Sequence, residues 1–212
     1  MLFRSDRPIE QSYFENYGVF ISKATKNTKS SIVGQYLKQH PVPFGEYIPV
    51  RKYLEWIPPL ALVPRDMIRG DSEKVFYVDD VKVSSVISFE GAFQRYIRNS
   101  VLKGAEVVVV LTNQASYGKS GMSDQFILMS TANALSNDRP LIHSAITGKS
   151  AIITNRGEIL KMSDLFEATT LTDSVTPMNS KTLYTRFGNY LNYLVLTISV
   201  LVFLKRFIRQ SD

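Results

Sequence analysis

Three stretches of the chain combine residues capable of chemistry with a rigid local backbone. In residues 38–49, KQHPVPFGEYIP, prolines and a glycine fix Lys38 and Glu46 eight positions apart. A second stretch, VISFEGAF, changes from a strand pattern to a helix pattern at Ser88, which exposes a small side chain near a helix N-terminus. A nucleophile at such a turn is well placed for oxyanion stabilisation. The third stretch, residues 110–118, is a strand end followed by a loop, VLTNQASYG.

The chain has no cysteine and only two histidines, His40 and His143. The lack of cysteine excludes disulfides, cysteine–zinc sites and a cysteine nucleophile. Two histidines make a poor catalytic metal site, so we expect no metal and no cofactor. His143 lies in an apolar strand pattern and is expected to be a hydrogen-bonded core residue. Residues 147–150, TGKS, look like the end of a phosphate-binding loop, but they lead into the strand-like run AIIT, so a simple turn is expected.

The excess of positive charge is concentrated at the C-terminal end. The 212 residues carry a net charge of +6, and residues 181–212 hold five basic residues against one acidic residue. The first 180 residues therefore have a net charge of only +2. A domain that binds phosphate backbones needs basic residues clustered across its folded surface. The charge distribution therefore indicates no nucleic-acid partner.

Residues 187–204 form an uncharged stretch of eighteen residues, FGNYLNYLVLTISVLVFL. As a helix they would extend about 27 Å, close to the hydrocarbon thickness of a bilayer. Tyrosines precede and begin the stretch, and basic residues follow it (Tyr184, Tyr190, Tyr193; Lys205, Arg206, Arg209). The alternative is a buried core helix, because Asn189 and Asn192 weaken the span. The position after a polar stretch favours a transmembrane helix.

The flanking charges predict the orientation of this helix. Basic residues stay in the cytoplasm, so the preceding domain is expected on the outer face of the cell membrane. The N-terminal residues MLFRSDRPIE lack the apolar region of a signal peptide. The expected organisation is a partial domain over residues 1–175, a linker over 176–186, a transmembrane helix over 187–207 and a cytoplasmic tail over 208–212.

The hydrophobic pattern of the body alternates strands with helices. The run EVVVVL at residues 106–111 is typical of a strand buried on both faces. Helices are predicted over residues 93–103 and 123–137, and the second has Phe126, Leu128, Met129, Ala132 and Leu135 on or near one apolar face. Further strands are predicted over residues 17–22, 74–78, 81–88, 141–145, 151–154 and 158–161. Helices between buried strands, together with hairpins, indicate an α/β layered sandwich.

The motifs together resemble the C-terminal part of the bacterial apolipoprotein N-acyltransferases, membrane members of the nitrilase or carbon–nitrogen hydrolase superfamily. The family loop K-x-H-L-V-P-F-G-E-Y-V-P is similar to residues 38–49, with Pro41 in place of leucine. The nucleophile segment I-C-Y-E-x-x-F is similar to residues 87–93, with Ser88 at the cysteine position. Shorter similarities, to T-N-D-A-W-F-G, N-G-R-P, T-G-x-S and the start of the last transmembrane helix, fall at residues 112–118, 137–140, 147–150 and 184–188.

This resemblance, which runs from about residue 17 to 206, implies a nitrilase-like αββα sandwich, N-terminally incomplete, with a C-terminal transmembrane helix. It implies acyl transfer through a Glu–Lys–Cys triad, from a phospholipid donor to the N-terminal cysteine amine of an apolipoprotein acceptor. Lys38 would stabilise the oxyanion beside Ser88, and Glu46 and Glu90 would be supporting carboxylates. The alternative for the carboxylates is an ordinary loop ion pair with Lys38.

Departures from the family pattern predict that this chain alone is impaired in catalysis. A cysteine thiol, with a pKa of about 8.5, is strongly nucleophilic, whereas the Ser88 hydroxyl needs a dedicated base. The family base is a glutamate in a W-P-E-like segment upstream of the lysine, and the 37 residues before Lys38 contain no such segment. Four further family residues are replaced (Gln114 for Asp, Ser116 for Trp, Asn133 for Arg, Ser136 for Glu).

Three hypotheses about function therefore remain. The first is an N-acyltransferase domain that is active only with a separately encoded N-terminal half, which supplies the membrane helices and the glutamate. The second is a non-catalytic degenerate remnant or a lipid-binding paralogue that is anchored in the membrane. The third is a soluble-type amidase, which the apolar tail and the missing cysteine disfavour.

Overall fold

The computed structural model describes residues 2–10, 13–22 and 29–211, with side chains over 13–22 and 29–207. Its larger sheet has six strands in the order β10-β9-β8-β7-β6-β5. The central strands β6, β7 and β8 are parallel, and the outer strands pair antiparallel to their neighbours. The bounds are β5 (Val75–Val78), β6 (Val81–Ile87), β7 (Val107–Thr112), β8 (Leu141–Ala145), β9 (Ala151–Ile153) and β10 (Ile159–Met162).

The valine run of β7 explains its central place in this sheet. Val108 and Val110 are fully buried against the helices, and Val107 on the opposite face packs with Phe20 of the smaller sheet. A strand with apolar side chains on both faces is stable only when both faces are covered. The prediction that residues 106–111 and the strand ending at Ser88 are neighbours is confirmed, because β6 and β7 pair in parallel.

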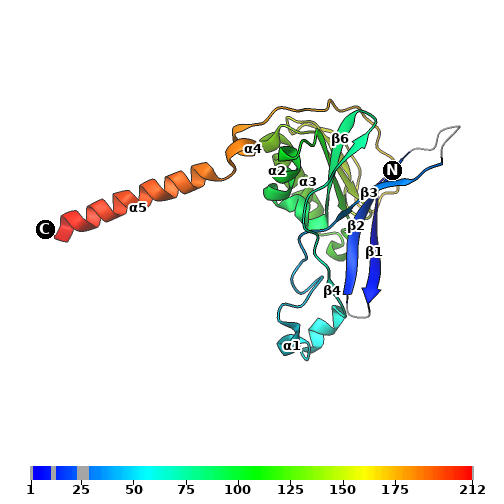
Figure 1. Cartoon of the computed structure of the whole chain (residues 1–212), viewed down its shortest axis with the longest axis horizontal. Coiled ribbons are helices and arrows are strands. Elements are labelled where there is room, and N and C mark those ends of the chain that lie inside the picture. Colours follow the sequence, from blue (N-terminus) through cyan, green and yellow to red (C-terminus); the bar gives the residue numbers. More distant parts are fainter. Residues whose placement is uncertain (1, 11–12, 23–28, 212) are drawn as a thin grey trace.

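Two helices cover one face of the six-stranded sheet, α2 (Gln94–Leu102) and α3 (Met122–Asn137), as Figure 1 shows. The smaller sheet contains β1 (Leu2–Glu10), β2 (Tyr13–Ile21) and β3 (Ile32–Leu37) in that order, and the short β4 (Asp66–Met67) pairs with β2. The two sheets meet where Phe20 stacks on Phe76, with ring centroids 3.8 Å apart. The described residues therefore form helix, sheet and sheet layers, as expected for the predicted α/β sandwich.

The predicted apolar face of α3 is wrong except at Phe126, which is buried. Leu128 and Leu135 are 68% and 59% exposed, and the buried face instead carries several polar side chains. Ser130 Oγ lies 2.9 Å from His143 Nδ1, and the Asn133 amide donates to the carbonyl of Gly91 at 2.9 Å. The Asn137 amide oxygen accepts a hydrogen bond from the Thr185 hydroxyl at 3.1 Å. Because these hydrogen bonds offset the cost of burying polar groups, the helix can turn a mixed face inward.

The elements that the pattern does not predict are β1, β3, β4 and the short helical segments α1 (Arg51–Leu54), η1 (Pro58–Leu62), η3 (Ala115–Tyr117) and α4 (Leu183–Phe187). The segment around α1 projects from the end of the sheets in Figure 1. It exposes large apolar side chains, with Tyr53 at 69%, Trp56 at 77% and Leu62 at 87%. Periodicity does not identify such a segment, because its apolar residues face solvent rather than a core.

The C-terminal helix α5 (Tyr190–Ser211) extends away from the body in Figure 1. Of the part of the chain that the structure describes, only this helix is long and apolar enough to cross a membrane. Its window Tyr190–Phe207 has a mean hydropathy of 1.4 and no buried residue, which excludes a core helix of this domain. The helix starts at Tyr190 and not at residue 187, because α4 (Leu183–Phe187) ends at Gly188, where φ is +61°.

Candidate functional site

Ser88 lies at a sharp turn between β6 and the short 3₁₀ helix η2 (Ser88–Ala92). Its φ angle is +54°, a conformation that residues other than glycine rarely adopt. Backbone strain of this kind is concentrated at functional sites, where it re-aims one side chain. The predicted transition from strand to helix at this residue is confirmed, although the helix that follows directly is 3₁₀ and α2 begins only at Gln94.

Glu90 holds this turn in place. Its side chain is fully buried and accepts hydrogen bonds from the Ile87 amide at 2.7 Å, the Tyr36 hydroxyl at 2.8 Å, the His40 amide at 2.9 Å and the Gln39 amide. Burial raises the pKa of Glu90, and these donors oppose that rise. The carboxylate thus ties the backbone before Ser88 to the backbone that follows Lys38.

Lys38 is fully buried at the end of β3 and forms an ion pair with Glu46. Its Nζ donates to Glu46 Oε1 at 2.6 Å and to Oε2 at a shorter distance. Glu46 Oε2 also accepts from the Val42 amide at 2.9 Å, so the P-V-P-F-G turn fixes the carboxylate. A buried ammonium requires such a partner, because an unpaired charge in the interior is costly.

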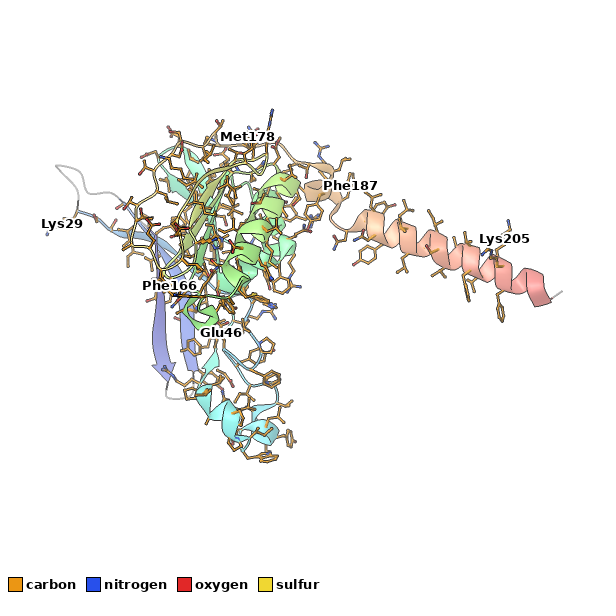
Figure 2. The ribbon with its side chains drawn as sticks, turned by 180° about the vertical axis from the view of Figure 1, so that it is seen from behind. Lys29, Glu46, Phe166, Met178, Phe187 and Lys205 are labelled. Atoms are coloured by element: carbon orange, nitrogen blue, oxygen red, sulfur yellow. The ribbon has the colours of Figure 1, made fainter. Side chains whose placement is uncertain are left out.

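A cavity of about 370 Å³ brings these elements together. One side is formed by Ser88 and by the loop of Glu46, with Val42 and Gly45. The other side is formed by four residues of the loop after β7: Asn113, Ala115, Ser116 and Tyr117. Figure 2 shows Glu46 where the body meets the projecting α1 segment. Ser88 and Glu46 therefore share one cavity, Lys38 binds Glu46 behind it, and Glu90 supports the turn from within. The catalytic and supporting roles of these four residues stay predictions.

His143 and residues 147–150 behave as predicted. His143 is 1% exposed, with Ser130 Oγ 2.9 Å from Nδ1 and Gln114 Nε2 3.4 Å from Nε2. Burial lowers the pKa of His143 to about 4, so the imidazole is neutral at pH 7. Residues 147–150 form a bend between β8 and β9 and open no helix. Among the described residues, no group of His, Asp and Glu is arranged to hold a metal ion.

Two residues of the site were missed in the sequence. Tyr36 is fully buried and donates to Glu90, and Gln114 is buried behind the cavity wall. The signal for Tyr36 was its place two residues before Lys38, which puts both side chains on the same face of a strand. Gln114 was noted only as a replacement for a family aspartate.

Comparison with known proteins gives the family. The model of the carbon–nitrogen hydrolase family matches residues 5–181. The chain belongs to this family. Among its curated relatives, the apolipoprotein N-acyltransferase of Geobacter metallireducens is 31% identical over 180 residues, which cover 85% of this chain and 34% of the relative. The apolipoprotein N-acyltransferase of Haemophilus ducreyi is 29% identical over 186 residues, covering 87% of this chain and 37% of the relative.

This carbon–nitrogen hydrolase chain thus spans somewhat more than a third of the length of these relatives. Among solved structures, an amidase of the nitrilase superfamily from Nesterenkonia has a TM-score of 0.55 at 13% identity, over 77% of this chain and 56% of the amidase. At this identity the likeness shows the fold alone. The nitrilase-like fold predicted for the chain is therefore confirmed.

Proposed function

We propose that this chain is the acyl-handling domain of an apolipoprotein N-acyltransferase-type protein, anchored in the cell membrane by α5 and impaired in acyl transfer when alone. The observation that carries the proposal is the shared cavity of Ser88 and Glu46, with Lys38 paired to Glu46 behind it. The relatives' name supports acyl transfer to an apolipoprotein acceptor, and we take a phospholipid as the acyl donor because α5 would hold the domain at a membrane.

The reaction requires two acyl transfers. A nucleophile at position 88 would attack the ester carbonyl of the phospholipid, and the lysophospholipid alkoxide would leave and take up a proton. The α-amine of the apolipoprotein cysteine would then attack the acyl-enzyme, form an amide, lose a proton and release the nucleophile. The Lys38 ammonium would stabilise both tetrahedral oxyanions, because a fixed cation in a dry site strongly favours developing negative charge.

The serine that occupies position 88 in the natural chain limits the rate of this reaction. A serine hydroxyl reacts only when a base removes its proton. Of the described residues that line the cavity, the one carboxylate is Glu46, which is already paired with Lys38. Without a further base, acyl transfer from Ser88 is expected to be very slow. A non-catalytic lipid-binding role is the second candidate, and the serine at this position favours it.

A separately encoded N-terminal half is proposed as the partner that supplies the missing base and membrane helices. The relatives have unmatched segments that could carry such a base and such helices, since this chain covers 34% and 37% of them. The smaller sheet also supports it, because β1 is the outermost strand and no described strand pairs with its other edge. An unpaired edge of nine residues is a template for a further strand.

Membrane attachment is proposed with the domain on the outer face and the C-terminus in the cytoplasm. The basic residues Lys205 and Arg206 at the end of the span support this orientation. The apolar side chains exposed around α1 support contact with lipid, because exposed apolar patches of this kind mark membrane or partner surfaces. A soluble-type amidase would need neither feature.

The test is to restore the thiol. Ser88→Cys is co-expressed in membranes with the N-terminal part of the Geobacter metallireducens relative that precedes the matched region, and supplied with an alkyne-labelled phospholipid. We expect an acyl thioester at position 88, detected by mass spectrometry, and none in the natural chain. An unacylated Ser88→Cys chain in a folded complex would overturn the proposal. Equal acylation of the natural chain would show that the hydroxyl is active.

A further inference from the structure

Successive residues of the loop after β7 contact successive residues of the bend after β8. The parallel pairing of the two strands ends with Thr112 opposite Ala145, but the contacts continue beyond the sheet. The Ile146 amide donates to the carbonyl of Thr112 at 3.1 Å. The Thr147 hydroxyl donates to Asn113 Oδ1 at 3.3 Å. The bend over residues 146–148 therefore follows the first residues of the cavity wall.

The third pair is Gln114 with Gly148. Gln114 is 2% exposed, whereas its neighbours Asn113 and Ala115 line the Ser88 cavity. A Cβ atom at Gly148 would lie 1.9 Å from Gln114 Oε1, 2.6 Å from its Cδ and 3.0 Å from Ser123 Oγ of α3. Atoms cannot approach so closely, so the space above the Gly148 backbone is filled by the Gln114 amide. A larger residue at position 148 would therefore displace the Gln114 side chain, whereas the backbone at Gly148 has no positive φ that would call for glycine.

The other side of the Gln114 amide meets His143. The distance from Gln114 Nε2 to His143 Nε2 is 3.4 Å, and His143 Nδ1 lies 2.9 Å from Ser130 Oγ of α3. The neutral imidazole can accept from one of these partners while it donates to the other. Gln114 is therefore held between β8 and the bend at Gly148, and His143 is in turn fixed by Ser130 of α3.

We propose that Gln114 is a positioning residue, which, seated between His143 and Gly148, fixes the wall Asn113–Tyr117 and so determines the size of electrophile that reaches position 88. The inference rests on the proposed function, because it takes the Ser88 cavity as the reaction site. It adds that the bend at Gly148, which does not itself line the cavity, controls the shape of the cavity through one side chain.

The experiment uses the full chain in detergent with Ser88→Cys, which provides the only thiol because the natural chain has no cysteine. The rates of alkylation by the small iodoacetamide and by the bulky N-phenylmaleimide are measured, and their ratio reports the space beside position 88. Gly148→Ala should expel the Gln114 amide and change this ratio by about fivefold, a size typical of coupling between residues in contact. Gln114→Ala should also change the ratio.

The combination of the two substitutions is the decisive variant. In a Gln114→Ala chain the added methyl at position 148 no longer meets the amide and keeps only the tight contact with Ser123 Oγ at 3.0 Å, so Gly148→Ala should change the ratio much less than it does in the presence of Gln114. The control is Gly121→Ala, because a Cβ at Gly121 has no atom within 4 Å and its φ of −67° suits alanine. A purely structural role would lower the melting temperature and leave the ratio of rates unchanged.

Two results would overturn the inference: an unchanged ratio in both folded single variants, or independent additive effects in the double variant. If Gly148→Ala does not fold, amide hydrogen exchange at residues 115–117 in Gln114→Ala decides, and exchange as slow as in the natural chain would count against positioning. A thiol that forms no acyl thioester yet shows these alkylation ratios would refute the proposed function and leave the positioning role standing.

Discussion

The hydroxyl of Tyr36 donates a 2.8 Å hydrogen bond to the carboxylate of Glu90, across 54 positions of the sequence. This contact joins β3 of the smaller sheet to the turn that follows β6 of the larger sheet. Because both groups are buried, the bond connects the loop of Lys38 and the turn of Ser88 where water cannot compete. The alignment of the site therefore depends on Glu90 as much as on the residues that face the cavity.

Glu90→Gln is expected to destabilise the domain by about 2–3 kcal/mol, since a carboxamide replaces a group that accepts four hydrogen bonds and its NH₂ must face N–H donors. Tyr36→Phe removes one donor to Glu90 and the acceptor of the Gln39 amide, and should cost about 1–2 kcal/mol. The free energies of unfolding are measured with urea in detergent. Equal costs for the two variants would show that the backbone amides contribute little.

Because Lys38 and Glu46 carry opposite charges, we expect their substitutions to shift the pKa of a thiol introduced at position 88 in opposite directions. In the Ser88→Cys chain, Lys38→Ala should raise the pKa of the thiol, because a nearby cation favours the thiolate. Glu46→Gln should lower that pKa, because the ammonium is no longer neutralised by a carboxylate. The pH profile of iodoacetamide alkylation measures both. Shifts in the same direction would mean that Lys38 does not act on position 88.

Truncation after Asn189 removes α5 and retains α4, whose Thr185 is buried against the domain. We expect the shortened chain to be released from carbonate-washed membranes, whereas a chain truncated after Phe207 keeps the apolar window and should stay bound. Retention of the shorter chain would assign membrane binding to another surface, for which the apolar side chains around α1 are the first candidates.

His143 makes stability depend on pH. Its pKa is lowered by burial from 6.5 to about 4, so between these values the unfolded chain binds a proton that the folded chain does not. Stability from this residue is therefore present above about pH 6.5 and is lost as the pH falls towards 4, by about 3 kcal/mol at most. His143→Gln should reduce this loss of unfolding free energy at acidic pH, which urea titrations at several pH values measure. The pKa of His40 is also lowered, by partial burial and by the nearby Arg95, so His40→Gln should reduce the loss in the same direction but by less.

Sequence patterns predicted the larger sheet well, because its strands are short apolar runs with turn residues between them. They identified Ser88, Lys38, Glu46 and Glu90 because motifs carry these residues at fixed spacing. The inward face of α3 could not be predicted, since hydrophobicity does not reveal that Ser130 and Asn133 find partners on other elements. The contact between Gln114 and Gly148 could not be predicted either, because it joins positions 34 residues apart and no local pattern indicates it.

The positive φ of Ser88 has an evolutionary consequence. The turn is held by Glu90 and by backbone amides, and none of these bonds involves the side chain at position 88. Selection for a folded domain therefore maintains the backbone geometry at position 88 whether or not its side chain reacts. Exchange of one atom, oxygen for sulfur, would place a thiol on the same turn. The shape of this turn is thus independent of the chemistry of the side chain that it presents.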